Sequence, residues 1–147
     1  MSERTVTHAT FAVERSYPVP PARVFEAWAD PVAKARWFGG DDWDHELDFS
    51  VGGREFSTGM MDGTSFTFEG RYQDIVPDER IVYSYEVLMG EARISVSLAT
   101  VELTPGGEGT KLVFTEQGAF LDGLDDPSQR ENGTGSLLDA LGKELER

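Results

Sequence analysis

The sequence contains no cysteine and only two histidines. Without cysteine the chain has no disulfide framework, no thiol nucleophile and no sulfur ligand for a metal, which suits a reducing compartment. No apolar run approaches the ~20 residues that a membrane-spanning helix needs, and the N-terminus lacks the basic-then-apolar pattern of a signal peptide. These absences predict a soluble, cytoplasmic protein with no membrane partner.

Positive charge is also scarce. Thirteen lysines and arginines stand against 27 aspartates and glutamates, which gives a formal net charge of −14. A field of this sign repels phosphate backbones and anionic lipids, so neither nucleic acid nor a membrane surface is an expected partner. We interpret the acidic residues as a solvated coat that keeps the protein soluble.

The length of 147 residues fits one domain, since domains commonly hold roughly 100–200 residues. A chain of this size buries about two-thirds of its unfolded surface and folds without a disulfide or a metal. The polar segment 1–9 is predicted to be a flexible N-terminus, and residues 10–147 are predicted to form a single domain.

The spacing of apolar residues predicts the order of helices and strands. Alternation predicts a strand over residues 11–19. Helical spacing predicts two short helices, over 21–29 and 32–37, separated by Asp30-Pro31 because the residue before a proline disfavours the helical conformation. From residue 43 to residue 116 the period becomes two, which predicts about six antiparallel strands.

One irregularity interrupts this alternation. The apolar residues of segment 94–98 set a phase that Val101 and Leu103 do not continue. One extra residue in a strand has this effect, so we predict a β-bulge near Ala99-Thr100.

The last segment predicts a long helix that starts near Asp126-Pro127. A stripe of four leucines recurs at helical spacing: Leu137, Leu138, Leu141 and Leu145. Three glycines in this segment each cost roughly 1 kcal/mol relative to alanine in a helix, so either its first half is irregular or small residues are needed where it meets another element. The predicted sheet needs its apolar face covered, and only this helix is long enough. The residues therefore predict an α+β fold in which a strongly curved sheet wraps around one helix and leaves a space between them.

Several motifs occur in an order that resembles one family. They are Val24-Phe25-x-Ala27-Trp28, Asp30-Pro31, Arg36-Trp37-Phe38-Gly39, Asp48-Phe49-Ser50-Val51-Gly52-Gly53, Asp74-Ile75-Val76-Pro77, Glu79-Arg80-Ile81-Val82 and Gly109-Thr110-Lys111-Leu112. Together they resemble the helix-grip superfamily, also called START-like or SRPBCC, and within it the homologues of the activator of the 90-kDa heat-shock protein ATPase. The resemblance covers about residues 10–145.

This resemblance implies a helix-grip fold. A curved antiparallel sheet of six to seven strands would wrap around the long C-terminal helix, with two short helices between the first and second strands. Relatives often carry aromatic residues at the start of the last helix, where this chain has the segment 131–135 without any, which would enlarge the pocket. A shared fold does not carry one activity, so the ATPase-stimulating role of the eukaryotic co-chaperone is not transferred.

Few residues are suited to catalysis. The weak candidates are Glu116, His45 and Tyr83, and whether the protein is an enzyme stays open. Desolvation favours the protonated form of a carboxyl group, so Glu116 among apolar residues is a candidate proton donor or base, with His45 as a second and Tyr83 as an orienting group. Alternation places the carboxylates near His45 on the opposite face of their strand, so neither a metal nor a cofactor is predicted.

The aromatic residues are the better indication of function. Small-molecule pockets are mostly apolar with a few placed polar groups. The predicted ligand-binding residues are Trp37, Phe38, His45, Phe56, Phe68, Tyr83, Glu116 and Leu137. The first hypothesis is a domain that encloses a small apolar or aromatic molecule between sheet and C-terminal helix. The alternatives are a cyclase-, aromatase- or hydrolase-like enzyme and a chaperone-linked protein-interaction module, with the chain a monomer or a homodimer.

Overall fold

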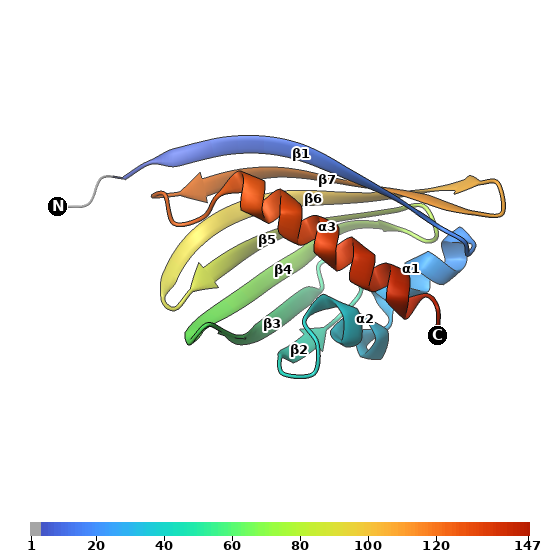
Figure 1. Ribbon diagram of the computed structural model, residues 1–147, viewed down its shortest axis with the longest axis horizontal. Coiled ribbons are helices and arrows are strands. Elements are labelled where there is room, and N and C mark those ends of the chain that lie inside the picture. Colours follow the sequence, from blue (N-terminus) through green and yellow to red (C-terminus); the bar gives the residue numbers. More distant parts are fainter. Residues whose placement is uncertain (1–3) are drawn as a thin grey trace.

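The computed structural model describes residues 4–147. Within this range an antiparallel sheet of seven strands is joined by three helices (Figure 1). The elements in chain order are β1 (Val6–Tyr17), α1 (Pro21–Ala29), α2 (Pro31–Phe38), β2 (Asp44–Leu47), β3 (Arg54–Met61), β4 (Thr64–Val76), β5 (Arg80–Met89), β6 (Ala92–Gly106), β7 (Gly109–Leu121) and α3 (Pro127–Glu144). The predicted α+β helix-grip fold is confirmed.

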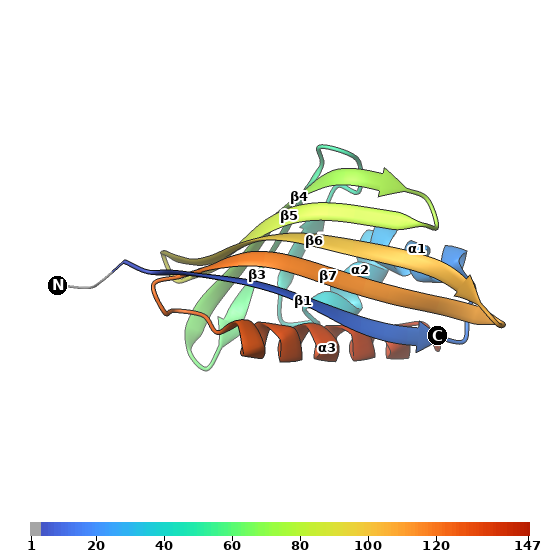
Figure 2. The same ribbon diagram turned by 90° about the horizontal axis from the view of Figure 1, so that it is seen from above.

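The strand order is β1-β7-β6-β5-β4-β3-β2. Strands β2 to β7 lie side by side in chain order, and β1 forms the other edge of the sheet by pairing with β7. Helix α3 runs along one face of this curved sheet, while α1 and α2 lie at the end where the chain passes from β1 to β2 (Figures 1 and 2). The core is the layer of side chains between the concave face and these helices.

Strand β1 begins earlier than predicted. Residues 6–10 pair with residues 117–121 of β7, so the strand starts at Val6 and not at Phe11. This pairing occupies part of the segment predicted to be flexible, and residues 1–3 of that segment lie outside the described residues.

The predicted β-bulge position was wrong. Ala99 and Thr100 pair regularly with Tyr83 and Val82, and the register shifts earlier, where Val87 pairs with Ser95 and Leu88 with Arg93. The extra residue is Ile94, so Ile94 and Ser95 are both buried. After this bulge the alternate residues Ser95, Ser97 and Ala99 face inward, and Val96 and Leu98 face outward.

Helix α3 is continuous through its glycines. Asp126 caps its N-terminus, because the Asp126 side chain accepts a hydrogen bond from the Ser128 amide at 2.9 Å. A Cβ at Gly135 would lie 3.0 Å from the Arg15 guanidinium, and a Cβ at Gly142 would lie 3.3 Å from the Tyr17 ring. Small residues are therefore placed where β1 crosses the helix. No helix among residues 4–147 is long and apolar enough to cross a membrane.

Candidate functional site

A cavity of about 430 Å³ lies between the concave face of the sheet and α3. Its lining residues with aromatic rings are Trp28, Trp37, Phe38, Trp43, Phe68, Tyr83, Tyr85 and Phe114. The helix side is formed by Arg130, Gly133, Thr134, Leu137 and Leu138. All three tryptophans of the chain are in this wall. The cavity is therefore a mainly aromatic chamber with few polar groups.

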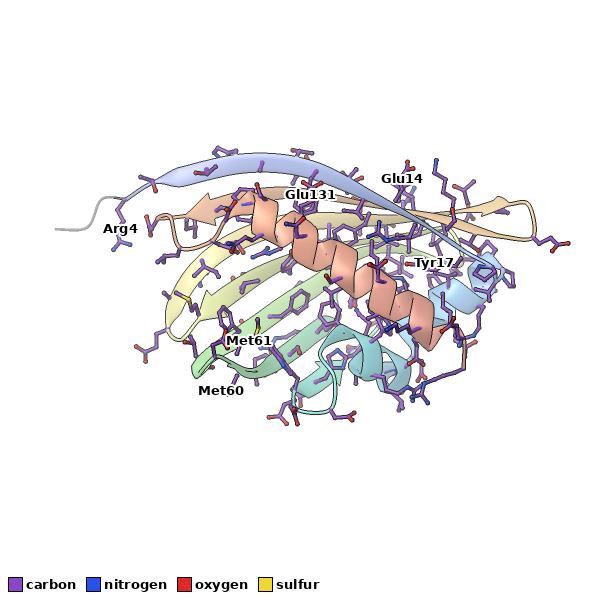
Figure 3. The ribbon with its side chains drawn as sticks, viewed as in Figure 1. Arg4, Glu14, Tyr17, Met60, Met61 and Glu131 are labelled. Carbon is purple, nitrogen blue, oxygen red and sulfur yellow. The ribbon has the colours of Figure 1, made fainter. Side chains whose placement is uncertain are left out.

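The cavity opens next to the turn that joins β3 to β4. A second hollow of about 270 Å³ adjoins it there and shares Trp43, Met61, Arg130 and Gly133 with it. Met61 is 53% exposed and lies with Met60 at the end of β3 (Figure 3). The open side of the cavity therefore lies beside Met61, between the β3–β4 hairpin and the first turns of α3.

The junction between α1 and α2 positions Trp28 and Trp37, which form the inner end of the cavity wall. Asp30 ends α1 and caps α2, because its side chain accepts a hydrogen bond from the Ala33 amide at 3.4 Å. The Trp37 indole donates to the Ala27 carbonyl at 2.9 Å, and the Trp28 and Trp37 rings meet edge to face with centroids 4.9 Å apart. These contacts fix both rings, so the inner wall is preformed.

Glycine makes room for Trp43 at the outer end. A Cβ at Gly59 would lie 2.4 Å from the Trp43 ring, and a Cβ at Gly39 would lie 3.0 Å from the Trp43 Cβ. The indole therefore lies flat across β3 where no side chain stands. Trp43 lines both hollows and forms part of the entrance.

Five of the eight residues predicted to bind a ligand line the cavity, namely Trp37, Phe38, Phe68, Tyr83 and Leu137. The other three are placed elsewhere. His45 and Glu116 lie behind the wall in hydrogen-bonded networks. Phe56 lies on the opposite face of β3, beside the Arg54 guanidinium, because Glu55 and Ser57 take the inward positions of this strand.

One network behind the wall contains a buried ion pair. Lys34 Nζ lies 3.0 Å from Glu55 Oε1, and the two side chains are 0% and 1% exposed. The Tyr72 hydroxyl donates to the same oxygen at 2.6 Å, and His45 Nε2 lies 2.7 Å from Glu55 Oε2. The Lys34 ammonium also lies within 6 Å of the ring centroids of Trp28, Trp37 and Phe38, a distance at which a cation is attracted to an aromatic ring.

The charges in this network hold one another in place. Burial by itself raises the pKa of Glu55, but the Lys34 charge and the hydrogen bonds from His45, Tyr72 and Lys34 outweigh burial and bring that pKa to about 2. Burial lowers the pKa of Lys34, and the Glu55 carboxylate limits this fall. Burial and the Glu55 charge raise the pKa of Tyr72 well above its ordinary value. Tyr72 therefore remains a neutral donor to an ionised Glu55.

The second network is centred on Glu116 of β7, which is fully buried. Its Oε1 accepts from the Tyr85 hydroxyl at 2.7 Å, and its Oε2 accepts from Ser97 at 2.8 Å and from Arg130 Nη1 at 3.2 Å. Arg130 Nη2 donates to Ser95 at 2.8 Å. The inward serines of β6 therefore satisfy charged groups that come from β7 and α3.

Arg130 connects this second network to the cavity. Its guanidinium also bonds Asp125 and donates to the Tyr85 hydroxyl at 3.0 Å. Burial lowers the pKa of Arg130, but Tyr85, Asp125 and Glu116 raise it more, so the guanidinium stays charged. Burial, together with the Glu116 charge, raises the pKa of Tyr85 above its ordinary value. Tyr85 therefore presents its ring to the cavity while its hydroxyl is held by Glu116 and Arg130.

Sequence reasoning missed Lys34, Glu55 and Arg130. Lys34 stands three and four residues before Trp37 and Phe38, so helical spacing puts a cation on the aromatic face. Arg130 stands seven residues before Leu137, on the leucine stripe of the last helix. A cation on an otherwise apolar helix face was the available signal for a buried carboxylate partner, because a buried charge is normally paired.

Comparison with known proteins gives a consistent result. A family model described as "Activator of Hsp90 ATPase homolog 1-like protein" matches residues 18–146. An uncharacterized protein from Rhizobium leguminosarum is 45% identical with a TM-score of 0.95, and the match covers 99% of each chain.

Two further solved structures extend this comparison. The Mll3558 protein from Rhizobium loti is 49% identical with a TM-score of 0.90, covering 95% of this chain and 99% of that chain. Protein CV1439 from Chromobacterium violaceum is 26% identical with a TM-score of 0.76, covering 94% of this chain and 97% of that chain. No curated protein matches the sequence.

Proposed function

The chain belongs to the Activator of Hsp90 ATPase homolog 1-like family, and from this premise we propose that it binds a small hydrophobic or aromatic molecule between its sheet and α3. The observation that carries the proposal is the aromatic cavity of about 430 Å³. Small-molecule sites are typically concave, about 300–1,000 Å³ in volume, mostly apolar and largely preformed. The cavity has these properties, and its opening beside Met61 supplies an entry path.

The environment of the acidic and basic groups favours binding over catalysis. A general acid or base must lie within hydrogen-bond reach of the reacting atom. Glu116 and His45 do not line the cavity, and the oxygens of Glu116 are already bonded to Tyr85, Ser97 and Arg130. The networks behind the wall are better suited to holding aromatic rings and α3 in position.

Gly133 allows the cavity to be filled without disturbing the core. It lies on α3, lines both hollows, and a Cβ added there meets no atom within 4 Å. Leucine at this position would extend into the entrance, whereas alanine would leave the entrance open. Both replacements remove a helix-interior glycine, so both variants should be as stable as the wild type or up to about 1 kcal/mol more stable.

The test is binding of tetralin, a neutral bicyclic hydrocarbon, by isothermal titration calorimetry. The NMR signals of the three indole N–H groups report whether the probe enters the cavity. We expect Gly133→Leu to weaken tetralin binding at least tenfold and Gly133→Ala to leave it unchanged. Equal binding by the leucine variant, or indole signals that do not move, would show that the molecule binds outside this cavity.

A further inference from the structure

Three hydroxyl groups on the cavity wall have no hydrogen-bond partner within residues 4–147. They belong to Ser57 of β3, Tyr83 of β5 and Thr134 of α3, whose exposed fractions are 2%, 3% and 5%. The indole N–H of Trp28, another lining residue, is the one side-chain polar atom among residues 4–147 that is fully buried without a partner, so the three hydroxyls are unpaired but open to the cavity. Buried polar groups are nearly always hydrogen-bonded, and leaving one unpaired is unfavourable. A ligand that fills the cavity buries these hydroxyls, so a ligand with polar atoms is favoured because it can pair with them.

Charged groups around the same cavity, in contrast, are satisfied by one another. Lys34 is paired with Glu55, and Arg130 is shared between Glu116 and Asp125. The second set carries one positive and two negative charges, so its field opposes an anion. A cationic ligand would need a carboxylate that is not already paired, and the carboxylates of both sets are bonded to Lys34 or Arg130. The interior is therefore arranged for a neutral guest.

We propose that the cavity selects neutral aromatic molecules that carry a hydroxyl or carbonyl oxygen, and that Tyr83, Ser57 and Thr134 hydrogen-bond this oxygen. The inference rests on the proposed function and specifies its ligand class. Tyr83 has the central place, because its ring lies between those of Tyr72 and Tyr85 with centroids 5.7 and 5.8 Å away. The hydroxyls of these two neighbours are bound to Glu55 and Glu116, so of these three tyrosines only Tyr83 has an unpaired hydroxyl on the cavity wall.

The protonation of Tyr83 agrees with this role. Burial raises its pKa well above the ordinary value, and electrostatic interactions with Tyr85, Glu55 and Glu116 raise it further. The hydroxyl therefore stays protonated across the physiological pH range and can donate a hydrogen bond to a carbonyl oxygen. An anionic ligand oxygen at the same place would face the same negative field.

The experiment compares probes that share one scaffold. Tetralin has no polar atom, α-tetralone and α-tetralol add a neutral oxygen, and the tetralin carboxylate and aminotetralin add a negative and a positive charge. We expect α-tetralone and α-tetralol to bind about fivefold tighter than tetralin, the difference that one net hydrogen bond makes. The carboxylate and the amine should each bind at least tenfold more weakly than α-tetralone.

Variants assign the preference to the hydroxyl. Tyr83→Phe should bind tetralin as the wild type does and lose the preference for α-tetralone, and Ser57→Ala should reduce this preference. Ser84→Ala, on the outer face of the same strand, is the matched control and should change neither affinity. Each variant's thermal unfolding is measured first, and Ser57→Ala tests the proposal if Tyr83→Phe does not fold.

The outcomes separate the two proposals. If no probe moves the indole signals, the cavity is not a binding site and both proposals fail. If tetralin and α-tetralone bind equally, the proposed function stands and the role of the hydroxyls is refuted. Tightest binding by the carboxylate or by the amine would likewise refute the neutral ligand class while leaving the binding function intact.

Discussion

Replacing Lys34 with methionine tests the buried ion pair most directly. The Lys34 and Glu55 side chains are almost completely buried, with Nζ and Oε1 3.0 Å apart. Methionine has a similar length and is apolar, so it can fill the space among the surrounding rings. The main consequence is that the Glu55 carboxylate stays buried without its cation. Breaking a buried pair by removing one partner destabilises a protein by about 3–5 kcal/mol.

The pKa of Glu55 links the stability of the whole network to pH. A fall from the ordinary 4.5 to about 2 corresponds to about 3 kcal/mol of stability. Because the pKa is lower in the folded state, this stability is fully present above pH 4.5 and is lost as the pH falls toward 2. The wild type should therefore lose stability in this window, and Lys34→Met should lose less there because its Glu55 is no longer held ionised by a cation.

Urea unfolding followed by circular dichroism at pH 7 and pH 3 measures both effects. At pH 7 we expect Lys34→Met to unfold with a free energy about 3–5 kcal/mol below the wild type. The double variant Lys34→Met/Glu55→Gln should recover part of this loss, because it no longer buries an unpaired charge. Lys143→Met, at an exposed position of α3, is the matched control and should stay within about 0.5 kcal/mol. A Lys34→Met variant as stable as this control would refute the reasoning.

Two further substitutions test how the wall of the cavity is held in place. Tyr17→Phe removes the 2.7 Å hydrogen bond from the buried Tyr17 hydroxyl to the Leu138 carbonyl. In urea titrations this should lower the free energy of unfolding by about 1 kcal/mol, and no change would show that this bond does not anchor α3. Gly59→Val places a side chain where the Trp43 ring lies. The free energy of unfolding should therefore fall by about 1–3 kcal/mol, and tryptophan fluorescence emission should shift to longer wavelength. An unshifted spectrum would show that the indole is not displaced.

The alternation of apolar residues in the sequence agrees with the buried faces of β5 and β7, because there the apolar residues point inward. Ile81, Tyr83 and Tyr85 are buried on β5, and Leu112 and Phe114 are buried on β7. On these strands burial of apolar side chains decides which face is covered, so the alternation of apolar residues in the sequence identifies that face.

On β3 the same reasoning gave the wrong face, and in the middle of β6 apolar alternation does not mark the buried face. Phe56 was expected inside, but Glu55 and Ser57 are the buried residues of β3. On β6, Ser95 and Ser97 are buried, whereas Val96 and Leu98 are 44% and 37% exposed. Glu55 on β3, and Ser95 and Ser97 on β6, meet charged partners from other elements, which the alternation of one strand does not show.

The sequence by itself determined the order of strands and helices, the breaks between them and the helix that covers the sheet. These features follow from local spacing, from proline and glycine positions and from the need to bury apolar area. Only the tertiary structure decided which polar groups are buried, because Lys34 finds Glu55, and Arg130 finds Glu116, through contacts between separate elements. On β3 and β6 such partners place polar residues on the inward face, where the sequence pattern by itself would place apolar ones.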